Sequence, residues 1–397
     1  MKAMILCAGK GTRLRPMTLA TPKPMIPLID KPVLQYIVEH LRRNNIDEIA
    51  VNLSYMPDEI TSFFRDGSAH GVDMFYSYEG KIEDGNFVGE AVGSAGGLKK
   101  IQNESAFFDD TFVVLCGDAA INMDIESLVK EHKQRNALAS IILKNVDKSE
   151  VSKYGIVALD DHGRIKEFQE KPEKESALST LANTGIYIFE PEIFEHIPDG
   201  VEFDLGGDLF PALSKKSDRF YGTVADFDWI DIGNLKDFSS ATATLLELTP
   251  KDMDLPGREV RPGIRLGVNV TIDLDKVHIE GPVYIGAGST IEPGARLIGP
   301  TVIGPNNVIG SNAIIHQSVL GPLTRVRANT FITSAIVYGG YLISASGDHE
   351  PLQAQGPIGD VRERLCDASA QTASVANLDL VDQIVSTEMT VNQKMSA

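Results

Sequence analysis

A glycine-rich turn with cations nearby is the first feature of this sequence that could hold a phosphate. The segment Leu6–Pro16 reads LCAGKGTRLRP, so an apolar run enters a turn that contains Gly9 and Gly11. Glycine lets backbone N–H groups approach an anion or a base edge closely. Arg13 stands in the same segment, and Lys23 follows between two prolines. Two cations beside a glycine turn at a strand end favour polyphosphate binding over a solvated surface turn.

The turn differs from the two common phosphate-binding fingerprints. It does not end in the Gly-Lys-Ser/Thr of a Walker A loop, and it lacks the third glycine of a dinucleotide-binding fold. Taken alone, its pattern of two glycines is weak. The flanking cations, and not the glycines alone, make it a candidate nucleotide site.

Two aspartates at the ends of apolar stretches are candidates for a metal. Asp118 follows the run Thr111–Cys116, and Asp231 closes the stretch Asp228–Asp231. Mg²⁺ binds one or two carboxylates together with phosphate oxygens and waters. Either aspartate considered singly is explained about as well by a helix N-cap or a turn.

A second group of polar residues lies further along the chain. Glu170-Lys171 alone would be a solvated surface pair. Asn183 and Gly185 stand beside an apolar strand, where an amide can read a hydroxyl group. Gly155 would let a sugar ring approach the backbone. These positions are candidates for a sugar pocket.

The motifs occur in the order found in a known family. They are Gly9–Pro16, Pro22–Pro24, Gly93–Gly97, Cys116–Asp118, Tyr154–Gly155, Glu170–Pro172, Asn183–Tyr187 and Trp229–Gly233. Over roughly its first 245 residues the chain resembles the sugar-1-phosphate nucleotidylyltransferases, also called NDP-sugar pyrophosphorylases. The resemblance implies a Rossmann-like, GT-A-like α/β fold with a mixed, mostly parallel sheet, followed by a C-terminal left-handed hexapeptide β-helix.

The resemblance also implies roles for particular residues. It implies that Asp118 and Asp231 meet to hold Mg²⁺, and that Lys171 binds the phosphate of the sugar 1-phosphate. Arg13, Lys23 and Lys171 are the expected catalytic cations. The expected nucleotide-binding residues are Gly9, Lys10, Gly11, Thr12, Glu90, Gly93 and Ser94, and the expected sugar-binding residues are Gly155, Glu170, Asn183 and Gly185.

The expected reaction needs no general base. A phosphate oxygen of the sugar 1-phosphate attacks the α-phosphorus of a nucleoside triphosphate in line, and pyrophosphate leaves. The attacking group is already an anion, so cations have the main work of offsetting charge repulsion. The absence of any serine–histidine–aspartate signature in the sequence fits this chemistry.

The sequence specifies the base and the sugar less closely than it specifies the class of reaction. Glu90 stands at the family's base-reading position, and a glutamate can only accept hydrogen bonds, from uracil N3–H or from guanine N1–H and N2–H. The longer loop Gly80–Phe87 with Gly93–Leu98, the connector Gly257–Gly263 and the coil pattern resemble the cyanobacterial-type UDP-glucose pyrophosphorylases, which implies UTP and glucose 1-phosphate. GTP and mannose 1-phosphate are the alternative, and the ADP-glucose enzymes are a third choice.

Two further hypotheses come from other classes. β-helix acyltransferases use a histidine as general base, and His316 follows Ile315 in the repeats, although a coil-surface histidine is the simpler explanation. A catalytically inactive regulatory subunit that binds sugar nucleotides is the other. The retention of Arg13, Lys23 and Asp118, and of the other two charged candidates, argues against it.

The first part of the chain alternates short apolar runs with helical segments. The runs are Ala3–Ala8, Ile49–Leu53, Met74–Tyr78 and Thr111–Cys116, and the helical segments are Val33–Asn44, Pro57–Arg65 and Ile125–Gln134. Such alternation indicates a mostly parallel sheet with both faces covered. Ligands bind beyond the carboxyl ends of such strands, so we expect the loops after Ala8, Tyr78 and Cys116 to matter.

The C-terminal part follows a different period. Aliphatic residues stand six apart at Ile279, Ile285, Ile291, Leu297, Ile303, Ile309 and Ile315. One inward-pointing aliphatic residue in every six is typical of a hexapeptide β-helix. The register fails at Gly321 and Arg327, which predicts that later turns are irregular or cap the stack.

These patterns predict the domain organisation. We expect a catalytic domain over 1–248, a linker over 249–263, the β-helix over 264–345 and an irregular or helical tail over 346–397. Open coil ends also favour a homo-oligomer formed through the β-helix.

Composition excludes several classes of protein. The 397 residues include 37 Lys and Arg against 55 Asp and Glu, a net charge of −18, which argues against a general nucleic-acid partner. We find no apolar run of membrane-spanning length, so no membrane partner is expected. The three cysteines form no disulfide framework or zinc cluster, as expected for a reducing cytoplasm.

Overall fold

The computed structural model describes residues 1–248, 253–353 and 356–361, and it contains two compact units. Among the described residues, the first unit comprises those of Met1–Pro256 with Ala345–His349, and the second comprises Gly257–Ser344 with those from Glu350 to Val361. Part of the expected linker, 249–252, and most of the expected tail, 362–397, lie outside the described residues. Within the described residues, no helix is both long and apolar enough to cross a membrane.

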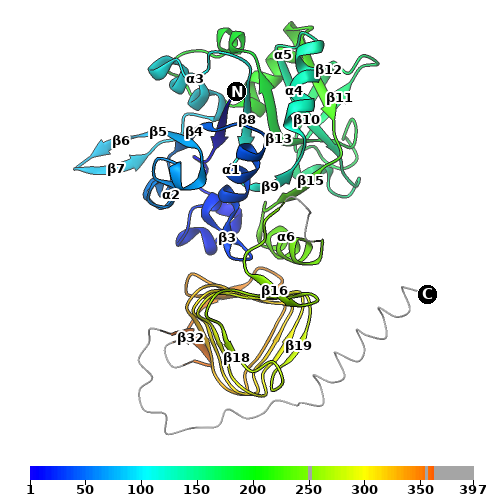
Figure 1. The fold of residues 1–397 in the computed structure, drawn as a ribbon. Helices are drawn as coiled ribbons and strands as arrows, with labels where there is room; N and C mark the ends of the chain where they lie inside the picture. Colours follow the sequence, from blue (N-terminus) through cyan, green and yellow to red (C-terminus); the bar gives the residue numbers. More distant parts are fainter. Residues whose placement is uncertain (249–252, 354–355, 362–397) are drawn as a thin grey trace. The chain divides into compact units, whose positions relative to one another are not determined.

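The first unit is built on a nine-stranded sheet (Figure 1). Its path is β12-β11-β13-β8-β1-β4-β5, with β10 beside β13 and β14 beside β10. Only β12 and β13 run against the other strands of this sheet, so it is mixed and mostly parallel, as predicted. The strands are β1 Lys2–Leu6, β4 Glu48–Leu53, β5 Asp73–Tyr78, β8 Phe112–Cys116, β10 Ala139–Asn145, β11 Gly155–Leu159, β12 Ile165–Glu170, β13 Leu181–Phe189 and β14 Phe220–Val224.

Three of the α-helices described in this unit match the predicted helical segments Val33–Asn44, Pro57–Arg65 and Ile125–Gln134, and three were not predicted. They include α1 Val33–Arg43, α2 Pro57–Phe64, α3 Ser94–Ser105, α4 Ile125–Gln134, α5 Phe210–Lys216 and α6 Leu235–Leu248. Asp124 caps α4, because its side chain accepts a hydrogen bond from Ser127 N at 3.0 Å. Smaller strands are β2 Pro27–Leu28, β3 Lys31–Pro32, β6 Gly80–Glu83, β7 Asn86–Gly89, β9 Ala119–Asn122 and β15 Asp228–Asp231.

The second unit is the predicted β-helix (Figure 1). Three sheets enclose one apolar core, with strand orders β16-β17-β20-β23-β26-β29-β30-β31, β18-β21-β24-β27-β32 and β19-β22-β25-β28. The strands are β16 Arg258–Arg261, β17 Ile264–Leu266, β18 Thr271–Ile272, β19 His278–Glu280, β20 Val283–Ile285, β21 Thr290–Ile291, β22 Arg296–Ile298, β23 Thr301–Ile303, β24 Val308–Ile309, β25 Ile314–His316, β26 Val319–Leu320, β27 Thr324–Val326, β28 Phe331–Thr333, β29 Ile336–Tyr338, β30 Tyr341–Ile343, β31 His349–Pro351 and β32 Ile358–Asp360.

The break in the sixfold period has a simple cause. Ile285 pairs with Ile303, so successive residues of the core stack lie three hexapeptides apart. Ile303 then pairs with Leu320, which is one residue closer along the chain. The period resumes in the new phase at Leu320, Val326 and Ile332, all of which are buried. The prediction that later turns are irregular or cap the stack is confirmed: this coil has one residue fewer, and β30 and β32 pair antiparallel with β29 and β27. A one-residue deletion in a turn shifts the phase and keeps the fold.

Truncating the β-helix core should destabilise it, and a surface truncation should not. Ile303 is fully buried in β23, whereas Val268 is 79% exposed. We expect Ile303→Ala to lower the free energy of unfolding of the β-helix by about 2–5 kcal/mol. Val268→Ala should change it by less than about 0.5 kcal/mol. Urea unfolding followed by circular dichroism measures both; equal effects would mean that Ile303 does not support the core.

Candidate active site

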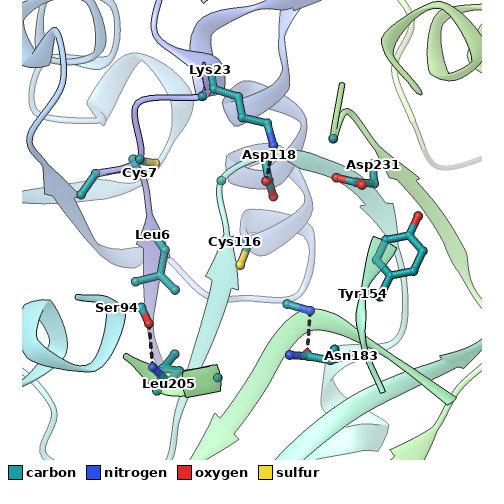
Figure 2. Close-up of a pocket in the computed structure, with 18 of the residues that line it drawn as sticks. Leu6, Cys7, Lys23, Ser94, Cys116, Asp118, Tyr154, Asn183, Leu205 and Asp231 are labelled. Carbon is teal, nitrogen blue, oxygen red and sulfur yellow. Dashed lines mark hydrogen bonds and ion pairs between the residues drawn. The ribbon is translucent and has the colours of Figure 1, made fainter. Parts of the chain in front are cut away.

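A cavity of about 600 Å³ lies in the first unit at the carboxyl ends of β1, β4, β5 and β8 (Figure 2). This is the edge at which ligands bind in parallel α/β sheets. Fourteen of the sixteen predicted site residues line it: Gly9, Gly11, Thr12, Arg13, Lys23, Gly93, Ser94, Asp118, Gly155, Glu170, Lys171, Asn183, Gly185 and Asp231. Lys10 and Glu90 are not among its lining residues.

The glycine turn packs directly on the segment that carries Lys23. Gly11 has a φ of +60°, and a Cβ built on it would lie 2.9 Å from the Cβ of Lys23. Its carbonyl oxygen accepts hydrogen bonds from Leu14 N at 3.0 Å and from Thr18 Oγ1 at 2.9 Å. Gly11 therefore does two jobs, because it makes the left-handed turn and leaves room for Lys23 at the floor of the cavity.

The two candidate metal ligands are brought together by a small sheet. Asp118 precedes β9, and Asp231 ends β15, which pairs antiparallel with β9 so that Asp231 faces Ala119. Ile232 N donates a hydrogen bond to the carbonyl oxygen of Asp118 at 3.2 Å. This pairing joins segments that are far apart in sequence, and it explains how the carboxylates come to share one wall.

Lys23 is bonded to Asp118 and also feels the charge of Asp231. Its Nζ is 2.5 Å from Asp118 Oδ2, and Figure 2 shows the two side chains pointing at each other with Asp231 nearby. Burial would lower the pKa of Lys23, but Asp118 and Asp231 outweigh that effect and raise it. Burial, and then the charge of Asp118, raise the pKa of Asp231 to about 7.

This donor set fits Mg²⁺. Asp118 and Asp231 lie close enough that the charge of Asp118 raises the pKa of Asp231, and a hard cation with oxygen ligands would relieve this repulsion. Among the described residues, no group of three or more histidine, cysteine, aspartate or glutamate side chains is arranged to hold a metal. The arrangement thus matches an ion bound by two protein carboxylates plus substrate oxygens, and differs from a closed structural metal site.

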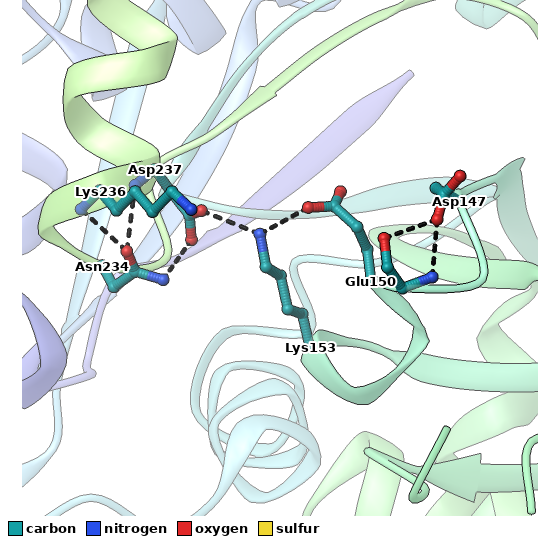
Figure 3. A network of polar contacts seen from close by, with 7 residues as sticks. Asp147, Glu150, Lys153, Asn234, Lys236 and Asp237 are labelled. Carbon is teal, nitrogen blue, oxygen red and sulfur yellow. Dashed lines mark hydrogen bonds and ion pairs between the residues drawn. The ribbon is translucent and has the colours of Figure 1, made fainter. Parts of the chain in front are cut away.

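A third carboxylate stands beside Asp231, and a lysine holds it (Figure 3). Lys153 Nζ is 2.8 Å from Glu150 Oε1 and 3.1 Å from Asp237 Oδ1. Asn234 Nδ2 donates to Asp237 Oδ2 at 2.5 Å. Lys153 and Asp237 both line the cavity. Sequence reasoning missed this network, since residues so far apart along the chain carry no joint signal.

The sugar-side candidates lie together on β11, β12 and β13. Lys171 Nζ is 2.7 Å from Glu170 Oε1, and both side chains are about half exposed. Asn183 Oδ1 accepts a hydrogen bond from Gly185 N at 3.0 Å. A Cβ on Gly155 would lie 2.6 Å from the Phe168 ring, so packing beneath the cavity also requires glycine there.

Two aromatic residues that the sequence analysis did not assign to the site also line the cavity. The rings of Tyr154 and Trp229 are 4.8 Å apart and tilted. Among the described residues, the buried Nε1 of Trp229 has no hydrogen-bond acceptor. A bound ligand oxygen could satisfy that donor.

Glu79, and not Glu90, faces the cavity on the base side. Glu90 is 67% exposed, and its carboxylate lies 3.7 Å from Lys81 Nζ. Glu79 lines the cavity and is 1% exposed. It directly follows β5, so the strand-end rule that singled out the loop after Tyr78 would have found it. Gly93 and Ser94 line the cavity nearby, and Ser94 Oγ donates to Asp204 Oδ2 at 2.8 Å.

His316 has no features of an exposed general base. It is 6% exposed on β25, and its Nδ1 lies 2.9 Å from Thr333 Oγ1. A buried, hydrogen-bonded histidine fits a structural role within the coil. The structure therefore does not favour the acyltransferase hypothesis.

The fold and the cavity together define a class: an α/β enzyme whose strand-end cavity gathers candidate phosphate-binding cations and a pair of acids. The sequence profile of the nucleotidyl transferase family matches residues 2–247, and this chain belongs to that family. The β-helix follows the matched region. The resemblance seen in the motifs is thereby confirmed.

Individual relatives support the same assignment. The chain is 50% identical over 354 residues to a UTP–glucose-1-phosphate uridylyltransferase of Synechocystis sp.. The aligned region covers 89% of this chain and 91% of the relative. It is 29% identical to a mannose-1-phosphate guanylyltransferase of Mycobacterium tuberculosis, covering 83% of this chain and 82% of that relative. A solved structure assigned as a glucose-1-phosphate thymidylyltransferase of Bacillus anthracis has a TM-score of 0.53 and 24% identity, over 64% of this chain and 97% of that one, and supports the fold alone.

A side chain at position 233 should disturb the acids. A Cβ built on Gly233 would lie 2.9 Å from Asp237 Oδ2 and 3.0 Å from Asp231 Oδ2. Gly233→Ala must therefore displace at least one carboxylate, and we expect kcat to fall on the order of 10²-fold.

Gly207→Ala is the matched control, because the nearest atoms to its Cβ would lie at an ordinary 3.7 Å. Initial-rate assays of pyrophosphate release compare the two variants. Wild-type turnover in Gly233→Ala would show that the positions of these carboxylates do not limit the reaction.

Proposed function

We propose that this chain transfers a uridylyl group from UTP to glucose 1-phosphate and releases pyrophosphate. The observation that supports this reaction is a cavity in which three candidate phosphate-binding cations and two acids meet. The 50% identity to a uridylyltransferase over 89% of the chain supports UTP and glucose 1-phosphate as the substrates. GTP and mannose 1-phosphate are the second candidate, supported by more distant relatives.

The cations divide the phosphate charge between them. Arg13 and Lys23 lie at the glycine turn, so they bind the β- and γ-phosphates and stabilise the leaving pyrophosphate. Lys171 lies on the sugar side and holds the phosphate that attacks. Gly9, Gly11 and Thr12 present backbone N–H groups to the triphosphate.

The acids serve the cation that such reactions generally use. When bound, Mg²⁺ neutralises phosphate charge as a Lewis acid, and Asp118 and Asp231 would hold it. Lys153 keeps Asp237 turned to its own ammonium group, which limits the repulsion that Asp237 adds beside Asp231.

The remaining lining residues position the sugar and the base. Glu170 and Asn183 hold sugar hydroxyls, and Gly155 and Gly185 keep that wall open. Glu79 accepts the base N–H in place of Glu90, because only Glu79 lines the cavity. Lys10 does not line the cavity, so this proposal gives it no role.

An assay of pyrophosphate release with four nucleoside triphosphates and two sugar phosphates tests the proposal. We expect UTP with glucose 1-phosphate to be the best pair. Asp118→Asn and Asp231→Asn, each removing a charge that would hold the metal, should lose on the order of 10²–10³ in kcat. A best rate with GTP and mannose 1-phosphate would favour the second candidate, and no turnover with any pair would favour a regulatory subunit.

Lys171 and Lys23 should act on different substrates. Loss of a lysine weakens binding of the anion that it faces. Lys171→Ala should raise KM mainly for glucose 1-phosphate, and Lys23→Ala mainly for UTP or, in reverse, pyrophosphate. Some loss of kcat is expected in both, since each charge also stabilises the transition state.

Two-substrate kinetics in both directions measure this division. Lys174→Ala is the control, because Lys174 is exposed and does not line the cavity. If Lys171→Ala and Lys23→Ala shifted the same KM alone, the two-pocket arrangement would be wrong.

A further inference from the structure

Glu79 is a buried carboxylate whose two oxygens are already held by protein donors. Asn52 Nδ2 donates to Glu79 Oε1 at 2.8 Å, and Val92 N donates to Glu79 Oε2 at 3.3 Å. Burial raises the pKa of Glu79, and the hydrogen bonds from Asn52 and Val92, followed by the charge of Lys100 on α3, partly offset that rise. Each carboxylate oxygen has two lone pairs, so the group keeps acceptor capacity for a ligand at the cavity wall.

The orientation of the Asn52 amide follows from its other partner. Cys7 N lies 2.8 Å from Asn52 Oδ1, and a backbone N–H can only donate. The atom facing Cys7 must therefore be the oxygen, which turns the NH₂ group toward Glu79. Asn52 is 2% exposed and lies in register with Leu6 on β1 and Ser77 on β5. A chain of two hydrogen bonds with fixed directions thus runs from Cys7 through Asn52 to Glu79, across three neighbouring strand ends.

A helix backbone closes the other side of the carboxylate. A Cβ built on Gly97 of α3 would lie 2.3 Å from Glu79 Oε1 and 3.1 Å from Asn52 Nδ2. Glu79 therefore sits where any side chain at position 97 would collide with it. Asn52, Val92 and Gly97 come from three different segments and leave the carboxylate little freedom to turn.

We propose that Asn52 is the positioning residue that holds Glu79 as a charged hydrogen-bond acceptor, and that this sets the preference for bases with an N–H on the edge that is read. Uracil, thymine and guanine present such an N–H, whereas cytosine and adenine present a lone pair at the corresponding ring nitrogen. The inference rests on the proposed function, and Asn52 acts through Glu79 because both ends of its amide are bonded within the protein.

The effect on Glu79 requires Asn52 to be a neutral donor. In Asn52→Asp two buried carboxylates would face each other and share a proton, since like charges raise one pKa strongly. Glu79 could then donate to the lone pair of cytosine N3. In Asn52→Ala the carboxylate loses a charged hydrogen bond and its fixed direction.

The experiment measures kcat/KM for UTP and CTP, with glucose 1-phosphate, in the full-length protein across a range of pH. We expect Asn52→Ala and Asn52→Asp to lower the UTP to CTP ratio about 10- to 100-fold. Asn103→Ala is the control, because Asn103 is exposed on α3 and its amide donates to the exposed Asp199, away from the cavity lining. The UTP to CTP ratio of Asn103→Ala should equal that of the wild type.

The pH profile separates positioning from general damage. The wild-type UTP to CTP ratio should fall as pH drops through the raised pKa of Glu79, because protonation removes the acceptor, whereas protonation of Asp231 affects both nucleotides alike. The Asn52 hydrogen bond lowers the pKa of Glu79. Its loss in Asn52→Ala should therefore raise that pKa and move this acidic limb of the pH profile to higher pH. The other titratable groups near Glu79, Lys100 on α3 and the thiol of Cys7 directly after β1, are unchanged in all variants.

A double variant keeps the test decisive if a single variant is unstable. In a Glu79→Gln background, Asn52→Ala should leave the UTP to CTP ratio unchanged, since the two residues act as one unit. An unchanged ratio and pH limb in Asn52→Ala would overturn the inference, as would additive effects of the two changes. Absence of uridylyl transfer by the wild type would instead refute the proposed function.

Discussion

One ammonium group bonded to the first of two neighbouring carboxylates is the arrangement on which the rest of the site depends. Lys23 bonds Asp118 at 2.5 Å, while Asp231 remains crowded enough that its pKa rises to about 7. Burying charges is costly unless they are paired, so this cluster constrains everything around it. The β9–β15 pairing holds the acids together, and Gly11 lets the glycine turn pack against Lys23.

The two sides of the cavity handle charge differently. Lys23 is 12% exposed and held at the floor, whereas Lys171 is half exposed and forms an ion pair with its neighbour Glu170. A preorganised cation suits a leaving group whose charge grows in the transition state. A more exposed cation suits a substrate that enters and leaves as an anion on the open side. The proposed division of roles follows from this difference in burial.

Much of the fold could be predicted from local patterns. The helical period over Ile125–Gln134 is reproduced residue for residue by α4, and the parallel strands follow the apolar runs. Counting in sixes found where the regular period stops, but it could not show that the stack continues, because a one-residue deletion in a turn shifts the phase. Leu320 continues the stack in the shifted phase.

The site was predictable where a residue directly follows a strand. Asp118 follows β8, and it lines the cavity as expected. Glu79 follows β5 in the same way, but Glu90 was chosen because it precedes the motif at Gly93. The pairing of Lys153 with Asp237 could not be read from the sequence, since it depends on α6 reaching a segment 84 residues away.

Lys23 and Asp118 should separate when substrate binds, the lysine moving to phosphate and the aspartate to the metal, and the proposed mechanism depends most on this exchange. A crystal structure with UTP and Mn²⁺, which gives an anomalous signal, tests it most directly. We predict an anomalous peak within bonding distance of Asp118 and Asp231, with Lys23 Nζ shifted from Asp118 to a phosphate oxygen. A peak elsewhere, with the Lys23–Asp118 pair intact beside bound UTP, would contradict this mechanism.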